Sequence, residues 1–261
     1  MQYQTIAIEL AGPVATVTLD RPDVRNAFNE ITIAELSLAF NGLAENAHVR
    51  AIVLAANGPA FCAGADLNWM KKMAGYSHSE NSDDAAKLAD MLRTIYTCHK
   101  PVVAKVQGDC YAGGMGLVAA CDIAVVSTSA SFCLSEVKLG LIPATISPYV
   151  IKAMGEQAAR RYFLTAEKFS AQEAHRIGFA HDIVAPDALD AHVAAIVNAL
   201  VTSSPNAVRE AKVLVRDITG RAIDSAMVMD TADRIANIRA SDEGREGVAS
   251  FLEKRKPSWL N

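Results

Sequence analysis

The stretch DCYAGGMGLVAACD, residues 109–122, places three glycines in four positions, Gly113, Gly114 and Gly116. Glycine costs a helix roughly 0.8–1 kcal/mol relative to alanine, so three glycines at a helix start indicate that the backbone itself is used. A helix start carries unpaired N–H groups and a partial positive charge. With no side chain in the way, an oxygen atom can approach the N–H of Gly113 within hydrogen-bond distance.

A second loop of small residues has the same character. The segment NGPAFCAGADL, residues 57–67, directly follows the short apolar run AIVLAA at 51–56. Two backbone N–H groups aimed at one oxygen form an oxyanion hole, and loss of one such donor costs about 2.7–4 kcal/mol of transition-state stabilisation. For either loop taken alone, a tight turn is the alternative interpretation.

The segments around these loops predict an α/β fold with a mainly parallel sheet. Short apolar runs indicate strands, and apolar residues at a helical period indicate helices. Their alternation is typical of a parallel sheet flanked by helices. The polar segment 70–84 is predicted to be a mobile loop. The predicted strands cover 3–10, 14–20, 51–56, 101–106 and 122–127, and the predicted helices cover 29–46 and 83–98.

The last third of the chain is predicted to be helical. Ser170 and Glu173 have the spacing of a capping box, and Gly178 follows as a helix-ending glycine. The apolar stripes of the later helices have to cover either the α/β core or another subunit. These helices are predicted at about 187–201, 206–218, 222–239 and 242–253.

Charge and composition exclude several classes of protein. Lys and Arg number 25 against 29 Asp and Glu, a net charge of −4 that argues against a nucleic-acid partner. The N-terminus lacks the pattern of a signal peptide, and no apolar run approaches the roughly 20 residues of a membrane span. We therefore expect a cytoplasmic protein without a membrane partner. The five cysteines are expected to be buried free thiols, with a catalytic Cys62 as the alternative, and the six histidines show no metal-ligand pairing.

The glycine cluster also matches a dinucleotide-binding pattern, with Gly114 and Gly116 followed by Ala119 and an acid, Glu136, 20 residues after Gly116. This alternative predicts an NAD-dependent oxidoreductase. Two observations disfavour it. The helix before Asp122 is too short for a crossover between parallel strands, and Glu136 lies well beyond the end of the next predicted strand.

Four segments in order carry a resemblance to a known family. They are DRPDVRNAFN at 20–29, FCAGADL at 61–67, GGMGLVAACDIAV at 113–125 and SFCLSEVKLGLIP at 131–143. Together they resemble the crotonase, or enoyl-CoA hydratase/isomerase, superfamily. The resemblance implies an α/β spiral of ββα repeats with a helical C-terminal trimerisation region. It further implies a core over 1–195 that holds the active site, a trimerisation region over 196–261, and a homotrimer or a dimer of trimers.

The resemblance also implies a binding site for an acyl-CoA thioester, with no cofactor besides the CoA of the substrate. The N–H groups of Ala65 and Gly113 hold the thioester oxygen as it becomes enolate-like. Arg25 lies near the CoA phosphates, and Phe251 and Lys254 reach the nucleotide of a neighbouring subunit; for Arg25 and Lys254 a solvated surface charge is the alternative. The remaining implied contacts to CoA or the acyl group are Ala27, Ala63, Asp66, Leu67, Gly114 and Gly116.

The acid–base chemistry is expected to rest on one carboxylate. Hydratases of this family with two glutamates place the first three residues after the oxyanion-hole glycine, where this chain has Gly116, and the second at the position of Glu136. The segments around Glu136 are apolar, and desolvation raises the pKa of a carboxyl group toward the range that suits proton transfer. An exposed Glu136 paired with Lys138 is the alternative.

Finer similarity points to hydratases of branched, carboxylated enoyl-CoAs. The segments AGADLNWMKKMAGYS, GGMGLVAACDI and FCLSEVKLGLIPATISPYVI look most like methylglutaconyl-CoA hydratases of leucine breakdown and carboxygeranoyl-CoA hydratases of acyclic terpene breakdown. This predicts hydration of a substrate like 3-methylglutaconyl-CoA, with Lys71 or Lys72 as candidate partners of its distal carboxylate. A Δ3,Δ2-enoyl-CoA isomerase, another crotonase-fold lyase and a non-catalytic acyl-CoA-binding subunit remain open.

Overall fold

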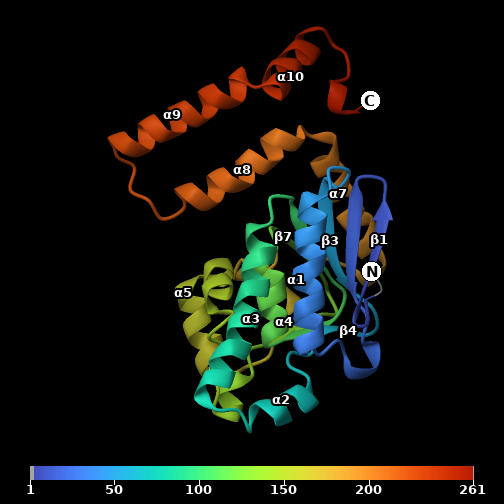
Figure 1. Ribbon diagram of the computed structural model, residues 1–261, viewed down its shortest axis with the longest axis vertical. Coiled ribbons are helices and arrows are strands. Elements are labelled where there is room, and N and C mark those ends of the chain that lie inside the picture. Colours follow the sequence, from blue (N-terminus) through green and yellow to red (C-terminus); the bar gives the residue numbers. More distant parts are fainter. Residues whose placement is uncertain (1–2, 261) are drawn as a thin grey trace.

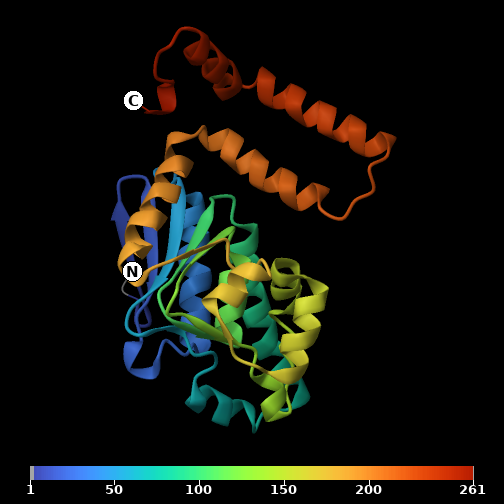
Figure 2. The ribbon, with the colours of Figure 1, turned by 180° about the vertical axis from the view of Figure 1, so that it is seen from behind.

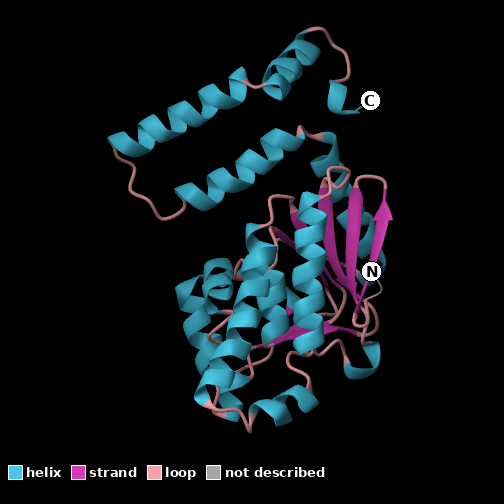
Figure 3. Ribbon diagram, viewed as in Figure 1, coloured by secondary structure: helices cyan, strands magenta, loops and turns pink. Residues whose placement is uncertain are grey.

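The computed structural model describes residues 3–260, in which two sheets are packed among helices (Figures 1 and 3). The larger sheet has the strand order β1-β2-β3-β5-β7-β10. Its first pair is an antiparallel hairpin and all its other pairs are parallel, as predicted. The strands are β1 (Ile6–Ala11), β2 (Val14–Leu19), β3 (Ala51–Ala56), β5 (Val102–Val106), β7 (Ile123–Ser127) and β10 (Asp182–Val184).

The smaller sheet has the order β4-β6-β8-β9 and was missed from the sequence. Its strands β4, β6 and β8 are parallel to one another, and β9 is antiparallel to β8. None of the four exceeds three residues, too few to show the alternation that identifies a strand. They are β4 (Ala60–Cys62), β6 (Asp109–Tyr111), β8 (Ser131–Cys133) and β9 (Phe169–Ser170).

The chain alternates between the two sheets and then forms a helix, and this unit repeats. Strand β3 of the larger sheet is followed by β4 of the smaller sheet and, after a short helix, by α3 (His78–Thr97). Strands β5 and β6 precede α4 (Gly113–Ala120), and β7 and β8 precede α5 (Ser147–Thr165). The predicted spiral of ββα repeats is therefore confirmed.

Helices cover both faces of the larger sheet. In the view of Figure 1, α1 (Glu30–Glu45) and α3 lie in front of the larger sheet. Figure 2, seen from behind, shows α7 (Leu189–Thr202) on the other face. The main core lies between the sheet and the helices α1 and α3, and it includes Leu36, Phe40 and Ile52, none more than 2% exposed. A smaller cluster joins α7 to β3, β5 and β7. Because both faces are covered, β3 has the continuous apolar sequence AIVLAA.

Three helices at the C-terminal end extend away from this core (Figures 1 and 2). They are α8 (Pro205–Ile218), α9 (Ser225–Ala240) and α10 (Asp242–Leu252), close to their predicted ranges. Within the described chain, Met227 and Ser250 are their buried residues. The division predicted at residue 195 falls inside α7.

The prediction of a mobile loop was wrong. The segment 70–84 is not a loop, because α2 (Leu67–Met73) covers its first four residues and α3 begins at His78. A capping box between Ser77 and Glu80 starts α3, a pattern present in the sequence that was overlooked.

The predicted capping box at α6 (Ala171–Arg176) forms only in half. Ser170 Oγ accepts a hydrogen bond from the Glu173 N–H, but the Glu173 carboxylate accepts instead from Arg176 and Tyr162. Gly178 ends this region with φ +81°, as a helix-ending glycine should. Within residues 3–260, no helix combines the length and the apolar character that crossing a bilayer requires.

Candidate active site

The candidate residues gather where the three parallel strands of the smaller sheet end. Ala65 follows β4, Gly113 follows β6 and Glu136 follows β8, each within three residues of the last strand residue. The carboxyl ends of adjacent parallel strands lie at one edge of a sheet, and ligands of α/β proteins bind there. The topology therefore brings together two backbone donors and one carboxylate from three different repeats.

The loop after β4 is held by backbone bonds to the segment 25–28. The Phe28 N–H donates to the Gly64 carbonyl at 2.9 Å, and the Asp66 N–H donates to the Phe28 carbonyl at 3.0 Å. These two bonds fix the residues on either side of Ala65. Within residues 3–260 the Ala65 N–H itself donates to no protein acceptor, so it is free to bind an oxygen.

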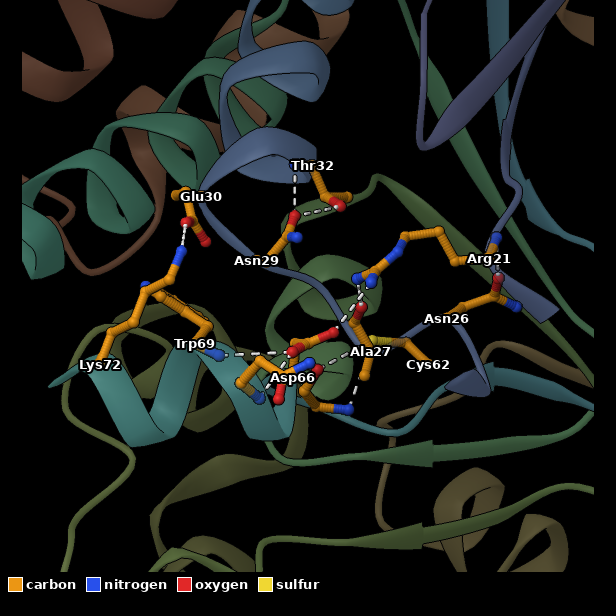
Figure 4. A network of polar contacts seen from close by, with 12 residues as sticks. Arg21, Asn26, Ala27, Asn29, Glu30, Thr32, Cys62, Asp66, Trp69 and Lys72 are labelled. Carbon is orange, nitrogen blue, oxygen red and sulfur yellow. Dashed lines mark hydrogen bonds and ion pairs between the residues drawn. The ribbon is translucent and has the colours of Figure 1, made fainter. Parts of the chain in front are cut away.

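A partly buried ion pair between Arg21 and Asp66 also fixes this loop (Figure 4). Arg21 Nη2 donates to Asp66 Oδ2 at 2.9 Å, and Arg21 Nη1 donates to the Ala27 carbonyl at 2.6 Å. Burial alone would raise the pKa of the Asp66 carboxyl, but bonds from Arg21 and from the N–H groups of Asn68 and Trp69 lower it below its usual range. Asp66 thus caps α2 and acts as a scaffold for the loop.

The second donor is presented by a strained turn. Ala112, before Gly113, has φ 47° and ψ −122°, a region disfavoured for side chains at a cost of about 1–3 kcal/mol. Its N–H donates to the Cys133 carbonyl of β8 at 2.8 Å, which holds the turn. Gly113 is the first residue of α4, so its N–H has no helical acceptor. An ideal Cβ on Gly64 would lie only 3.1 Å from the Ala112 Cβ, so the two donor loops are in contact.

All three glycines of the cluster are sites of close packing. An ideal Cβ would lie 2.3 Å from Phe28 Cζ at Gly113 and 2.8 Å from the Cys62 Cβ at Gly114. The dinucleotide-binding alternative is wrong, because α4 leads directly into β7 and these glycines accommodate protein atoms rather than a pyrophosphate.

At Gly116 an apolar side chain occupies the space that a first glutamate would need. An ideal Cβ there would lie 2.3 Å from Ile146 Cγ2 and 2.8 Å from Ile146 Cβ, and Ile146 is only 2% exposed. The side chain of Leu92 lies just beyond, at 3.6 Å. The absence of a glutamate at position 116 thus goes together with a buried isoleucine, Ile146 at the start of α5, in the space that its side chain would need.

Glu136 begins a 3₁₀ helix, Glu136–Leu139, and its side chain is half-buried. Its Oε2 atom is buried and hydrogen-bonds to nothing within residues 3–260. Burial raises the pKa of its carboxyl group, while its own backbone N–H lowers it less. In the described chain Lys138 forms no ion pair with Glu136. The alternative of an exposed Glu136 paired with Lys138 is therefore wrong. An unpaired, desolvated carboxylate at a strand end is suited to proton transfer.

The remaining predicted contacts are divided between the rim of this site and the far end of the molecule. Ala63 donates its N–H to the Arg25 carbonyl at 3.0 Å, and Arg25 Nη2 pairs with Asp109 at 2.6 Å. Leu67 is 74% exposed at the start of α2. Phe251, 82% exposed, lies in the last turn of α10, and Lys254 follows the end of that helix. Both are at the end of the molecule opposite α2 (Figures 1 and 2), so the structure does not bring them to the site of their own chain.

Two other expectations concern reactive groups near the site. Desolvation raises the pKa of the buried Cys62 thiol to about 12, so a catalytic thiolate there is wrong. Lys72 Nζ pairs with Glu30 Oε1 at 2.5 Å (Figure 4), whereas Lys71 is exposed. Across residues 3–260 no three His, Cys, Asp or Glu side chains cluster as metal ligands would.

Sequence reasoning missed the residues that position the site. Phe28, Ala112 and Ile146 act through contacts with residues distant in the chain, for which no local pattern exists. Arg21 and Asn26 lie within the quoted motif at 20–29 and could have been singled out there. Asn26 is 2% exposed, and its Nδ2 donates to two backbone carbonyls, which ties the motif to the β3–β4 connection.

Comparison with known proteins agrees with this geometry. The sequence profile of the family described as Enoyl-CoA hydratase/isomerase matches residues 9–261. The crystal structure of an enoyl-CoA hydratase from Shewanella pealeana is similar with a TM-score of 0.96 and 44% identity, over 99% of this chain and 97% of that chain.

Two curated relatives are similar along nearly their whole length. A crotonyl-CoA hydratase of Syntrophomonas wolfei is 30% identical over 100% of both chains. The mevalonyl-coenzyme A hydratase sidH of Aspergillus fumigatus is 32% identical over 94% of this chain and 91% of its own. The chain therefore belongs to the enoyl-CoA hydratase/isomerase family, and its two sheets and ββα repeats form the crotonase fold.

Proposed function

We propose that this protein adds water to a 2-enoyl-CoA, with Ala65 and Gly113 as the oxyanion hole and Glu136 as the acid–base group. One observation carries the proposal: the Glu136 carboxylate is partly desolvated and has an unpaired oxygen, at the sheet edge where two free N–H groups follow the neighbouring strands. Family membership supports the same reaction class.

In the proposed reaction the thioester oxygen accepts hydrogen bonds from both amides, which stabilise the negative charge that develops on it. The water oxygen bonds to C3, the π bond between C2 and C3 breaks, and its electrons move toward the thioester oxygen. Glu136 takes a proton from the water and delivers a proton to C2, so that the carboxylate is regenerated. A single carboxylate performs both transfers, because Ile146 occupies the position of a second one.

We further propose a branched, carboxylated acyl group like that of 3-methylglutaconyl-CoA. The supporting observations are the similarity of the segments around 63–77, 113–123 and 132–151 and the glycine at position 116. Lys71, exposed beside the site loop, is the candidate partner of the distal carboxylate, since Lys72 is already paired with Glu30.

The test follows the ultraviolet absorbance of the conjugated thioester when purified protein is mixed with 3-methylglutaconyl-CoA, crotonyl-CoA and a 3-enoyl-CoA. Loss of absorbance with the first two substrates supports hydration, and a higher kcat/KM for 3-methylglutaconyl-CoA supports the acyl group proposed. Gain of absorbance with the 3-enoyl-CoA alone would identify an isomerase instead. No change in absorbance with any of the three acyl-CoAs would indicate a binding subunit.

We also propose that α8–α10 assemble the chain into a homotrimer or a dimer of trimers. Large apolar side chains on and after these helices are exposed, and Phe251 and Lys254 can contact a CoA nucleotide only in a neighbouring copy. The most exposed of them are Val215, Ile223, Met229, Phe251 and Leu252. Sedimentation velocity tests this proposal, and a monomer at micromolar concentration would contradict it.

A further inference from the structure

We infer that Phe28 is a positioning residue that sets the separation between the two oxyanion-hole amides. The inference rests on the proposed function, because it concerns how the donors of Ala65 and Gly113 are placed. Phe28 belongs to neither donor loop and has no polar side-chain group. Its role follows from contacts with both loops at once.

The backbone of Phe28 holds the first donor. Its N–H and carbonyl bond to Gly64 and Asp66, the residues on either side of Ala65, at 2.9 and 3.0 Å. This parallel bridge between Phe28 and Ala65 fixes the direction of the Ala65 N–H. A rotation of the Ala65 peptide would break one of these two bonds.

The ring of the same residue supports the second donor. The position of an ideal Cβ on Gly113 lies 2.3 Å from Phe28 Cζ and 2.7 Å from Cε1, so the tip of the ring packs against the glycine. Phe28 is 2% exposed and cannot retreat into solvent. The rigid side chain is therefore a spacer between the Ala65 backbone and the Gly113 backbone.

The spacer is braced from outside the two loops. The ring of Trp69 lies 5.9 Å from the Phe28 ring, centroid to centroid, with the planes tilted by 51°. Trp69 is itself held, since its N–H donates to Asp66 Oδ1 and its Nε1 donates to Asp84 Oδ1, both at 3.3 Å. The Phe28 ring thus contacts Trp69 and Gly113, and hydrogen bonds hold both Trp69 and the turn before Gly113.

If Phe28 is a spacer, the length of its side chain determines where Gly113 lies. If Phe28 only filled the core, a change in its length would alter stability but not the position of Gly113. Phe28→Leu removes the ring tip that packs on Gly113 and lets the glycine move toward the Phe28 backbone. Phe28→Tyr lengthens the side chain by a hydroxyl at the atom nearest Gly113 and pushes the glycine away. Misplacement of a catalytic group by about 1 Å can cost about 100-fold in rate, so we expect kcat to fall about 10- to 100-fold in both variants with KM changed less than about threefold.

The matched control is Phe40→Leu, which removes the same atoms from a fully buried phenylalanine of α1 that is outside both donor loops. We expect it to lower the thermal midpoint about as much as Phe28→Leu and to leave kcat within about twofold of wild type. Circular dichroism verifies that each variant is folded at the assay temperature.

A second measurement reports on the oxyanion hole without turnover. Acetoacetyl-CoA has no double bond to hydrate, and its enolate absorbs in the ultraviolet, so the pH at which the bound molecule enolises reports how well the amides stabilise negative charge. We expect this pH to rise in Phe28→Leu and Phe28→Tyr and to stay unchanged in Phe40→Leu.

Wild-type kcat and an unchanged enolisation pH in both folded Phe28 variants would overturn the inference while the proposed function stands. Equal losses of kcat in Phe40→Leu would also overturn it, because the effect would then be general loosening of the core. If the wild-type protein hydrates none of the enoyl-CoAs, the proposed function fails first, and enolisation of bound acetoacetyl-CoA still tests the geometry.

Discussion

The body formed by the two sheets and the group of helices α8–α10 bury their apolar residues very differently. In the body, strands such as β3 and β5 are buried nearly throughout and face covered cores on both sides. In α8 no residue is buried within the described chain, and α9 buries only Met227. The body thus buries most of its apolar side chains within the chain, whereas the C-terminal helices expose apolar surface that monomeric proteins usually cover. This contrast supports the proposal that the first region carries the chemistry and the second the assembly.

The largest effect that separates the regions is expected from Glu136→Gln. The amide keeps the shape of the side chain but cannot accept a proton from water, so kcat should fall about 10²–10⁴-fold while the oligomeric state is unchanged. Turnover of the best enoyl-CoA and sedimentation velocity check this. A near-normal rate would remove Glu136 from the mechanism.

A second change tests whether the glycine cluster is a packing device. Gly113→Ala puts a Cβ 2.3 Å from Phe28 Cζ, and such overpacking costs about 1–3 kcal/mol of folding free energy. Gly42→Ala is the control: it lies within α1 with no atom within 4 Å of the added Cβ, and should stabilise by up to about 1 kcal/mol. Chemical denaturation measures both. Similar effects of the two substitutions would contradict the close contact.

A third change tests the link between the two regions. Lys212 of α8 donates to Asp122 Oδ2 at 2.7 Å and to the Lys100 carbonyl at 3.1 Å. Lys212→Met leaves the Asp122 carboxylate with one backbone N–H, that of Val102, and should cost about 1–3 kcal/mol. Because this pair lies away from the strand ends that form the site, kcat of the folded variant should stay within about twofold. A larger fall in kcat would mean that α8 affects the site.

The smallest expected effect is on the pH dependence of thermal stability, through the carboxyl group of Glu136. The folded-state pKa of Glu136 is raised by burial, so the native chain binds more protons than the unfolded chain between the two pKa values. Stability from this group is present below the unfolded value and is lost as pH rises through the folded value. Glu136→Gln should therefore raise the thermal midpoint relative to wild type at pH 7, and the difference should vanish near pH 4. A lower midpoint for the variant at pH 7 would contradict the raised pKa.

Much of the fold could be predicted because its evidence is local. The apolar runs at 51–56 and 101–106 and the helical period at 29–46 correspond to β3, β5 and α1. The smaller sheet could not be predicted, because strands such as β4 and β6 exist through pairing with residues far along the chain. The segment 70–84 was misread because its polar composition outweighed the capping box at Ser77.

The site divides in the same way. The glycine cluster and Glu136 could be selected from the sequence, because glycine at a helix start and an acid among apolar residues have direct chemical meanings. The packing of Ile146 on Gly116 and of Phe28 on Gly113 could not, since each contact depends on how separate repeats are stacked. The resemblance links the motif at 20–29 to CoA through Arg25, but its half-buried Arg21 and buried Asn26 serve as scaffold.

The alternation of the chain between its two sheets has a consequence for protein engineering. Each proposed catalytic group is carried by a separate connection, so the 134–146 connection can be exchanged for another while the bonds of Phe28 and of the Ala112 N–H that support the two amide donors remain. Such grafts would retain the ability to stabilise an enolate and would alter only where the proton goes. One scaffold could then be redirected between water addition and double-bond migration by replacing a single loop.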